Sequence, residues 1–364
     1  MRKVILPPLV SGEDVPLVPK NATGRPWLSI LIPVYNVLPW LEDCLSSVFS
    51  QIEGDEGIEL ILLDDRSTDG SAELAEALIA SHGGRARLLH HAENRGLSAA
   101  RNSMADAAAG DYVWFLDSDD ALLPGAIGAL REIVEGCRPD VVLCDYACSG
   151  GKVHATFEGP ARQFRLGTEA LVAGIFSRRR LHAWSRVWKR EVLEGVRFPE
   201  GVYFEDMATI PWLLLRAESY YYAAQPWVFY RSRPGSILAQ VRADCDYRRD
   251  DELAGAMAGF REELVRVLPG VSQETRRLVA LFLAREYVKL GKRLLRVRRR
   301  QRVLHLLRGD LSRYRKKMEA ASPLPFAEIA ACHARKGELV RWAALCFFLA
   351  LSRHMWRLVP GAAH

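Results

Sequence analysis

The sequence predicts an α/β fold, a mostly parallel sheet with helices on both faces, followed by an α-helical C-terminal region. Short apolar runs alternate with amphipathic segments over residues 28–145, a pattern typical of a parallel sheet. Polar loops follow three of the apolar runs, beginning at Pro33, Asp64 and Asp117. Right-handed crossovers bring the carboxyl ends of parallel strands to one edge, so these loops are expected to form one site.

Five strands and three helices are expected in this region. The strands are short apolar runs suited to burial on both faces, and the helices carry apolar residues three and four positions apart. The expected strands are 28–32, 59–63, 87–90, 112–116 and 139–145, and the expected helices are 41–49, 71–80 and 98–109. The strand at 112–116 is central to the site, because three carboxylates follow it at Asp117, Asp119 and Asp120.

Composition indicates a globular protein with two or three domains in 364 residues. Seven cysteines are scattered, and no histidine or second pair completes a zinc site around Cys144 and Cys148, so reduced thiols and a cytoplasmic location are expected. The apolar run 4–6 is too short for a signal peptide. Residues 1–26 contain five prolines and are expected to form an extended N-terminal arm.

The remaining chain divides by pattern near residue 240. Residues 27–240 are expected to form one α/β domain, with a first half at 27–146 and an aromatic-rich second half at 147–240. Residues 241–364 are expected to be helical, with no strand.

The net charge of +6 is concentrated in residues 285–317, which hold fourteen Lys and Arg against two acidic residues. Leucines alternate with these cations as in a basic amphipathic helix, which suits an anionic membrane surface; a core helix with a solvated basic face fits equally well. Residues 339–351 are apolar but shorter than the roughly 20 residues that span a bilayer. Residues 339–357 are therefore expected to lie at a membrane interface or pack on other helices, and no nucleic-acid partner is expected.

The loops at the sheet edge offer the groups that a nucleotide needs. Tyr35 and Asn36 can stack on a base and bond its edge, and Asp65 can accept from an imide N–H or a ribose hydroxyl. A glycine turn leads into the helix at 98–109, with arginines on both sides of it. Clustered carboxylates after 112–116 suit Mg²⁺ or Mn²⁺, with phosphates completing the coordination.

Four segments together resemble family 2 glycosyltransferases, which have the GT-A fold. They are SILIPVYN (29–36), LDDRSTDGS (63–71), NRGLSAARN (94–102) and FLDSDD (115–120). The resemblance covers about residues 27–236. It implies an inverting, metal-dependent transferase that moves a sugar from a nucleotide-diphosphate sugar to an acceptor hydroxyl, as in the synthesis of bacterial surface polysaccharides or glycolipids.

The resemblance also implies roles for individual residues. Asp206, in a segment similar to the family's Glu-Asp pair, is expected to be the general base, with Glu205 beside it. Arg186 stands where the family more often has Lys, and Ile237-Leu238 where Ile-Thr is common. The expected site is Pro33, Tyr35, Asn36, Asp65, Arg95, Arg101, Asp117, Arg231 and Arg233 for the nucleotide, Asp117 and Asp119 for Mn²⁺ or Mg²⁺, Asp206 and Glu205 for catalysis, and Trp184 and Arg186 on the acceptor side.

A UDP-sugar is the expected donor and a saccharide or lipid-linked molecule the expected acceptor, with the enzyme in the cytoplasm or peripheral on the inner face of the membrane. Two alternatives stay open at this point. A phosphatase of the haloacid-dehalogenase type also has Asp-x-Asp after an apolar strand, but nearer its N-terminus. An inactive, membrane-associated scaffold of the same fold is the other.

Overall fold

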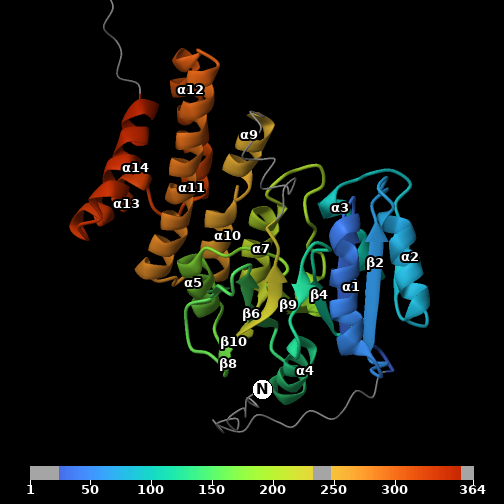
Figure 1. Cartoon of the computed structure of the whole chain (residues 1–364). Helices are drawn as coiled ribbons and strands as arrows, with labels where there is room; N and C mark the ends of the chain where they lie inside the picture. Colours follow the sequence, from blue (N-terminus) through green and yellow to red (C-terminus); the bar gives the residue numbers. More distant parts are fainter. Residues whose placement is uncertain (1–23, 233–246, 354–364) are drawn as a thin grey trace, which may run out of the picture. The chain divides into compact units, whose positions relative to one another are not determined.

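The computed structural model describes residues 24–232 and 247–353 (Figure 1). The described residues form two compact units. The sheet unit comprises 24–201 and 216–232, and the helical unit comprises 202–215 and 247–353. The boundary expected near residue 240 lies outside the described residues, as does most of the N-terminal arm. The division also differs from the expected one, because residues 202–215 belong with the C-terminal helices.

The sheet unit contains one ten-stranded sheet and the helices that cover it. Its strands are β1 (Leu28–Val34), β2 (Ile58–Asp64), β3 (Arg87–His90), β4 (Tyr112–Phe115), β5 (Ala121–Leu122), β6 (Val141–Cys148), β7 (Val153–His154), β8 (Phe164–Leu166), β9 (Arg186–Lys189) and β10 (Ser219–Tyr230). Its helices are α1 (Leu38–Ile52), α2 (Ser71–Ser81), α3 (Leu97–Ala107), α4 (Ala126–Cys137), α5 (Thr168–Arg178) and α6 (Arg190–Leu193).

The strand order is β3-β2-β1-β4-β9-β6-β10-β5, which confirms the α/β fold class. The first four strands are parallel, as predicted. β9 lies antiparallel between β4 and β6, so the second half of the domain continues the sheet of the first half. Sequence patterning missed β9, a four-residue antiparallel strand, and β10, a twelve-residue strand in the aromatic-rich segment. Neither has the continuous aliphatic run that marks the buried parallel strands of the first half.

Strand β1 is buried along its whole length, as expected for a strand covered on both faces. Leu28, Ile30 and Ile32 point into a core shared with α1 and α4, while Leu31 points to the opposite face. Figure 1 shows α1 and α2 on one side of the parallel strands and α3 behind them. This packing fixes the carboxyl ends of β1, β2 and β4 side by side, since Ile32 pairs with Leu62 and Leu31 with Phe115.

The helical unit contains the helices predicted after residue 240, and no strand occurs in its described residues. Its helices are α7 (Glu205–Arg216), α9 (Tyr247–Gly255), α10 (Phe260–Val267), α11 (Gln273–Arg300), α12 (Leu304–Ala321), α13 (Phe326–Arg335) and α14 (Leu339–Ser352). Trp212 of α7 packs edge-on against Phe260 of α10, with ring centroids 5.4 Å apart. This aromatic contact ties α7 to the C-terminal helices.

Helix α14 packs on α11 through a glycine. A Cβ at Gly291 would lie 2.6 Å from the ring of Phe348, so only glycine permits this approach. The hydroxyl of Tyr287 donates to the carbonyl of Phe348 at 3.1 Å. One side of α14 therefore serves packing, whereas Val340 and Phe347 remain exposed. Among the described residues, no helix combines the length and the hydropathy needed to cross a bilayer.

Candidate active site

Three aspartates lie together where β4 ends. Asp117, Asp119 and Asp120 each bring a carboxylate oxygen within 4.8 Å of the others. The chain turns tightly here, since the backbone N–H of Asp120 donates to the carbonyl of Asp117 at 3.0 Å. Asp117 and Asp119 are partly accessible to solvent, whereas Asp120 is buried.

Asp120 is the most constrained carboxyl group of the cluster. Burial, and then the charges of Asp117 and Asp119, raise its pKa to about 9. One oxygen accepts the backbone N–H of Arg231 at 2.8 Å, while the other is buried and has no hydrogen-bond partner among the described residues. A buried acceptor without a donor is costly, and either a proton or a cation would satisfy it. The oxygen set thus fits a hard divalent ion such as Mg²⁺ or Mn²⁺.

The thiol of Cys44 on α1 is affected by the negative charge of the same three aspartates. Its thiol is fully buried and lies 3.8 Å from the carbonyl of Asp117. Burial raises the pKa of Cys44 well above its usual value, and the three aspartates raise it further. A neutral thiol is therefore the group that α1 presents to the cluster, and it adds no further negative charge.

Arg101 of α3 is the cation partner of Asp117, at 2.9 Å between guanidinium and carboxylate. Only 1% of Arg101 is exposed, and its guanidinium lies over the ring of Phe198, 5.3 Å from the ring centroid. The sequence predicted Arg101 as a nucleotide ligand and suggested no cation beside Asp117. In this structure the buried guanidinium of Arg101 helps to fix Asp117. This pairing could not be predicted from local spacing, because the two residues are sixteen positions apart on different elements.

Arg231 lies where β10 ends, next to the cluster. Its backbone N–H donates to Asp120, and its guanidinium pairs with Asp43 at 3.0 Å. The Arg231 charge lowers the pKa of Asp120, opposing the two neighbouring aspartates. The prediction that Arg231 neutralises a diphosphate is compatible with this place in the fold. Arg233 lies outside the described residues.

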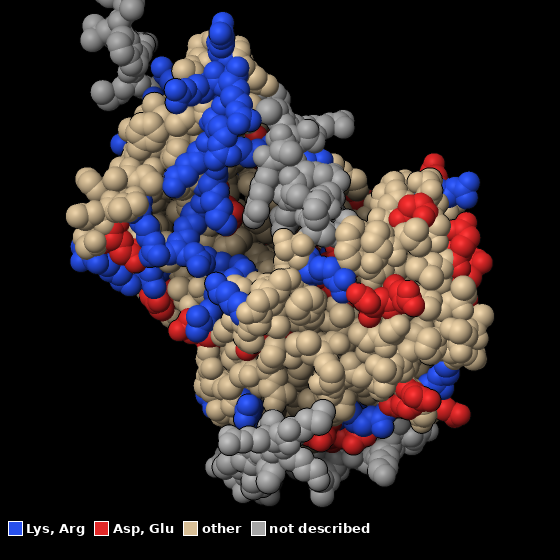
Figure 2. Space-filling model, in the orientation of Figure 1, with Lys and Arg blue, Asp and Glu red and all other residues tan. Residues whose placement is uncertain are grey.

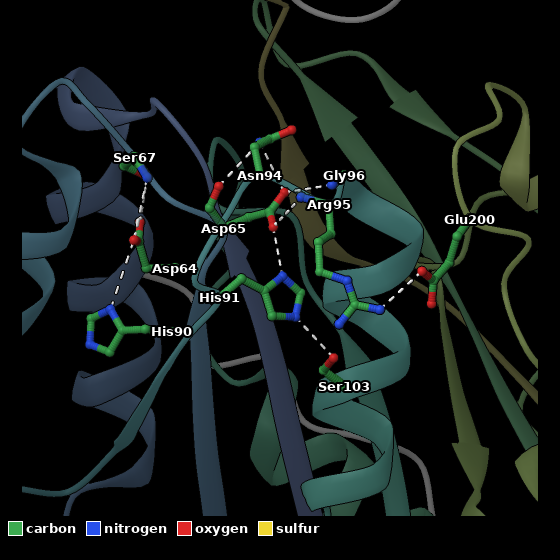
Figure 3. Close-up of polar contacts among 10 residues, drawn as sticks. All are labelled: Asp64, Asp65, Ser67, His90, His91, Asn94, Arg95, Gly96, Ser103 and Glu200. Carbon is green, nitrogen blue, oxygen red and sulfur yellow. Dashed lines mark hydrogen bonds and ion pairs between the residues drawn. The ribbon is translucent and has the colours of Figure 1, made fainter.

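Asp65, predicted to hold the nucleoside, is hydrogen-bonded to the loop before α3 (Figure 3). Its carboxylate accepts from the side chain of Asn94 at 3.0 Å and from the backbone N–H groups of Arg95 at 2.9 Å and Gly96 at 2.7 Å. His91 Nδ1 lies 2.6 Å from the same carboxylate. A carboxylate offers about four acceptor positions, and all of them are engaged here. Direct nucleoside binding by Asp65 would require one of these bonds to be replaced.

His91 connects this loop to α3. Its Nε2 lies 3.0 Å from the hydroxyl of Ser103, so the ring bridges Asp65 and Ser103. Sequence analysis missed His91; a histidine directly after the β3 strand, level with a strand-end carboxylate, was the available signal. The guanidinium of Arg95 extends away from Asp65 and pairs with Glu200 at 3.1 Å, with both side chains partly exposed (Figure 3).

The loop after β1 carries the aromatic face that was predicted for a base. Tyr35 is 47% exposed at the sheet edge, directly after buried Pro33 and Val34. Asn36 adopts a positive φ of 50°, and its side-chain oxygen accepts the backbone N–H of Thr68 at 2.8 Å. Asn36 therefore holds the β1 and β2 loops together, while Tyr35 keeps a free aromatic surface.

Trp184 and Arg186, predicted on the acceptor side, are both buried. Trp184 stacks on His182, with ring centroids 4.4 Å apart, and on Tyr230 at 5.7 Å. The guanidinium of Arg186 is fully buried and donates to the carbonyls of Arg180 and His182. Arg186 thus closes a turn of its own chain, and an acceptor could reach it only if this turn opened.

Glu205 and Asp206 are the first residues of α7 in the helical unit, and both are partly accessible. The segment before them is held by α9. Tyr203 donates its backbone N–H to Glu252 at 2.8 Å, and its ring lies under the guanidinium of Arg249, 4.1 Å from the centroid. Phe204 has a positive φ of 63°, which is rare for a bulky residue and concentrates at functional sites.

Comparison with known proteins agrees with the sequence resemblance. Residues 29–185 match the family model described as glycosyl transferase family 2. Over 242 residues the chain is 29% identical to the glycosyltransferase GlyG of Streptococcus pneumoniae, covering 61% of this chain and 76% of GlyG. Matches to three further curated relatives cover 55 to 64% of their lengths, so the chain spans less than two thirds of those proteins.

Solved structures share the fold. Residues 1–349 of S. aureus TarS, crystallised with UDP-GlcNAc, match with a TM-score of 0.67 at 18% identity, over 90% of this chain and 93% of that one. The mannosyltransferase PcManGT of Pyrobaculum calidifontis, solved with GDP-Man and Mn²⁺, matches with a TM-score of 0.50 at 19% identity, over 91% and 87%. These matches confirm the predicted GT-A fold. From the family match, residues 29–185 of this chain form a glycosyl transferase family 2 domain, and the solved structures share its fold.

Proposed function

We propose that this chain transfers a sugar from a nucleotide-diphosphate sugar, with a UDP-sugar as the first candidate, to an acceptor hydroxyl with inversion at the anomeric carbon. The observation that carries the proposal is the aspartate cluster after β4, with its buried, unpartnered Asp120 oxygen. The nucleotides bound by TarS and PcManGT support the class of donor. An acceptor that is a saccharide or lipid-linked, and a role in envelope polysaccharide synthesis on the cytoplasmic side, belong to the same proposal.

The loops at the edge of the sheet supply the groups that would bind the donor. The exposed face of Tyr35 is available to stack on a base, and Asn36 fixes the loop that carries it. Asp117, Asp119 and Asp120 would together hold Mn²⁺ or Mg²⁺. A bound divalent ion supplies charge neutralisation for the departing diphosphate. Arg101 keeps Asp117 in place, and Arg231 adds a positive charge beside the cluster.

Inversion requires one in-line displacement. The acceptor oxygen bonds to the anomeric carbon while the bond from that carbon to the diphosphate oxygen breaks. One carboxylate within hydrogen-bond reach takes the acceptor's proton, and no nucleophilic carboxylate is needed. We assign this base to Asp206, with Glu205 as its neighbour or as an acceptor contact.

Calorimetry with UDP, GDP and dTDP, with and without Mn²⁺, tests the donor and metal assignments together. We expect tight binding of one nucleotide only with the metal, and loss of that binding in Asp119→Ala. Asp106→Ala is the matched control, because exposed Asp106 pairs with Arg197 outside the cluster. Nucleotide binding that needs no metal and is unchanged in Asp119→Ala would remove the metal assignment. A screen of UDP-, GDP- and dTDP-sugar hydrolysis then identifies the sugar.

A further inference from the structure

A basic groove runs along α12 in the helical unit. It has a volume of about 650 Å³ and is lined by His305, Arg308, Ser312, Arg313, Lys316 and Lys317, together with Gly309. These residues recur every three or four positions, so they lie on one face of the helix. Figure 2 shows Lys and Arg side chains gathered in a band over this part of the molecule. None of them is among the residues assigned to the donor, the metal or the general base.

Part of this charge already has partners within the helical unit. Lys317 pairs with Asp251 of α9 at 2.5 Å, and Arg313 lies 3.7 Å from Asp251 and 3.8 Å from Asp310. Two carboxylates therefore face a groove whose wall carries four Lys and Arg side chains and a histidine. Lys and Arg side chains thus outnumber the carboxylates that pair with them in these contacts, and the groove attracts anions.

The length of the groove favours long anions over short ones. From His305 to Lys317 the helix rises about 18 Å, at roughly 1.5 Å per residue. Its Lys and Arg side chains run from Arg308 to Lys317, about 14 Å of this length, which exceeds one diphosphate. Gly309 lies on the same face, and a Cβ there would meet no atom within 4 Å, so the missing side chain leaves open space between the cationic positions.

We propose that the α12 groove binds an extended polyanion, a chain that carries repeated phosphate groups. A flat bilayer fits the groove less well, because a concave surface cannot lie flush on it. The exposed apolar side chains of the helical unit are also mostly elsewhere, with Leu339, Val340 and Trp342 on α14. Binding in the groove requires no donor or metal, so it can fail or hold independently of the proposed transfer reaction.

The test measures binding of short-chain inorganic polyphosphate to the full chain in EDTA, without nucleotide. Pyrophosphate and vesicles of phosphatidylglycerol with phosphatidylcholine are the comparison ligands. Lys316→Glu reverses one charge in the groove, and Lys292→Glu makes the same change at an exposed position of α11 outside it. Gly309→Glu places a negative charge in the groove, and Gly309→Ala is its control. A Cβ at this position meets no atom within 4 Å, and both substitutions improve helix propensity.

We expect polyphosphate to bind more tightly than pyrophosphate, with an affinity that falls as salt rises. Lys316→Glu and Gly309→Glu should each weaken it on the order of tenfold and lower the slope of log affinity against log salt by about one. Lys292→Glu and Gly309→Ala should leave it near that of the wild type. Equal effects of Lys316→Glu and Lys292→Glu would overturn the groove assignment, and so would binding to vesicles without binding to polyphosphate.

Discussion

At the scale of single residues, Asp120 has a buried oxygen with no protein donor among the described residues and a pKa raised to about 9. At pH 7 the ionised form is therefore disfavoured in the metal-free fold, whereas the unfolded chain ionises freely. Asp120→Asn keeps the shape and removes this conflict. We expect the variant to have a higher Tm than the wild type in EDTA, and to lose the rise in Tm that Mn²⁺ with nucleotide gives the wild type.

Asp106→Asn is the matched control for that measurement, since Asp106 is exposed and paired with Arg197. If Asp120→Asn kept the full metal-dependent rise in Tm, the third carboxylate would have no part in holding the ion. Asp117 and Asp119 would then be sufficient, as the sequence alone predicted.

A second prediction for a single residue concerns Asp206, the proposed general base. Asp206→Asn keeps the size of the side chain but cannot accept a proton from the acceptor hydroxyl. We expect transfer to fall by ~10²–10⁴-fold while binding of the donor is nearly unchanged. Glu205→Gln is the paired variant, one position away on α7. Near-normal turnover by Asp206→Asn together with an inactive Glu205→Gln would exchange the two assignments.

At the scale of elements, the loop of residues 91–96 is held to β2 through Asp65. His91→Asn removes the ring that bridges Asp65 and Ser103, and so loosens the loop that leads into α3. Hydrogen bonds to a charged group contribute about 1.5–3 kcal/mol, so a measurable fall in the free energy of unfolding is expected. We expect KM for the donor to rise more than kcat changes, because the loop positions binding groups.

His90→Asn is the control for His91→Asn, since the side chain of His90 is about half exposed and lies 3.8 Å from Asp64. If both variants changed KM alike, the bridge through His91 would not be what positions the loop. Rescue by His91→Gln, which can still donate to Asp65, would separate a positioning role from a loss of packing.

The turn of residues 180–186 predicts a pH dependence of stability. Burial, and then the charges of Arg186 and Arg180, lower the pKa of His182 well below its usual value. In the unfolded chain a histidine binds its proton near pH 6.5. The unfolded state therefore takes up more protons as the pH falls below about 6.5, and the free energy of unfolding should fall between pH 7 and 5. Denaturant titrations at both values should show a smaller fall for His182→Gln than for exposed His305→Gln.

Sequence patterning worked well for elements whose pattern is local. The strands β1, β2 and β4 were predicted from runs such as 28–32 and 112–116, since strands covered on both faces must be apolar throughout. The loops that follow them were predicted to share an edge, and Asp117 with Asp119 does lie there. Patterning failed where a partner is distant in sequence. Arg101 on Asp117 and His91 on Asp65 depend on how α3 and β3 pack, which no local spacing records.

At the scale of the whole molecule, the residues predicted to bind donor and metal and the residues predicted to act as the base belong to different units. The groups assigned to donor and metal that the structure describes lie in the sheet unit, whereas Glu205 and Asp206 belong to the helical unit. The sequence indicated a boundary near residue 240, because composition changes there. It could not show that residues 202–215 join the C-terminal helices, since that depends on long-range contacts such as Trp212 with Phe260.

This division predicts what truncation does. A chain that ends at residue 279 keeps the whole sheet unit but loses most of α11 and all of α12, and with them Arg293 and Lys317, the partners of Asp250 and Asp251 on α9. Asp250 is almost fully buried, and removing one partner of a buried ion pair typically costs about 3–5 kcal/mol. We therefore expect α9 to lose its support, and with it the segment of Tyr203 that precedes Asp206.

The truncated chain should accordingly bind UDP with Mn²⁺ but transfer no sugar, as measured by calorimetry and by a transfer assay on the same preparation. A chain that ends at residue 353 is the control and should do both. The single substitution Arg293→Met isolates the buried ion pair and should lower the Tm of the full chain without changing nucleotide affinity. If the chain ending at 279 bound no nucleotide while remaining in solution, the sheet unit would depend on the C-terminal helices for its donor site as well, and the two units would act as a single folding unit.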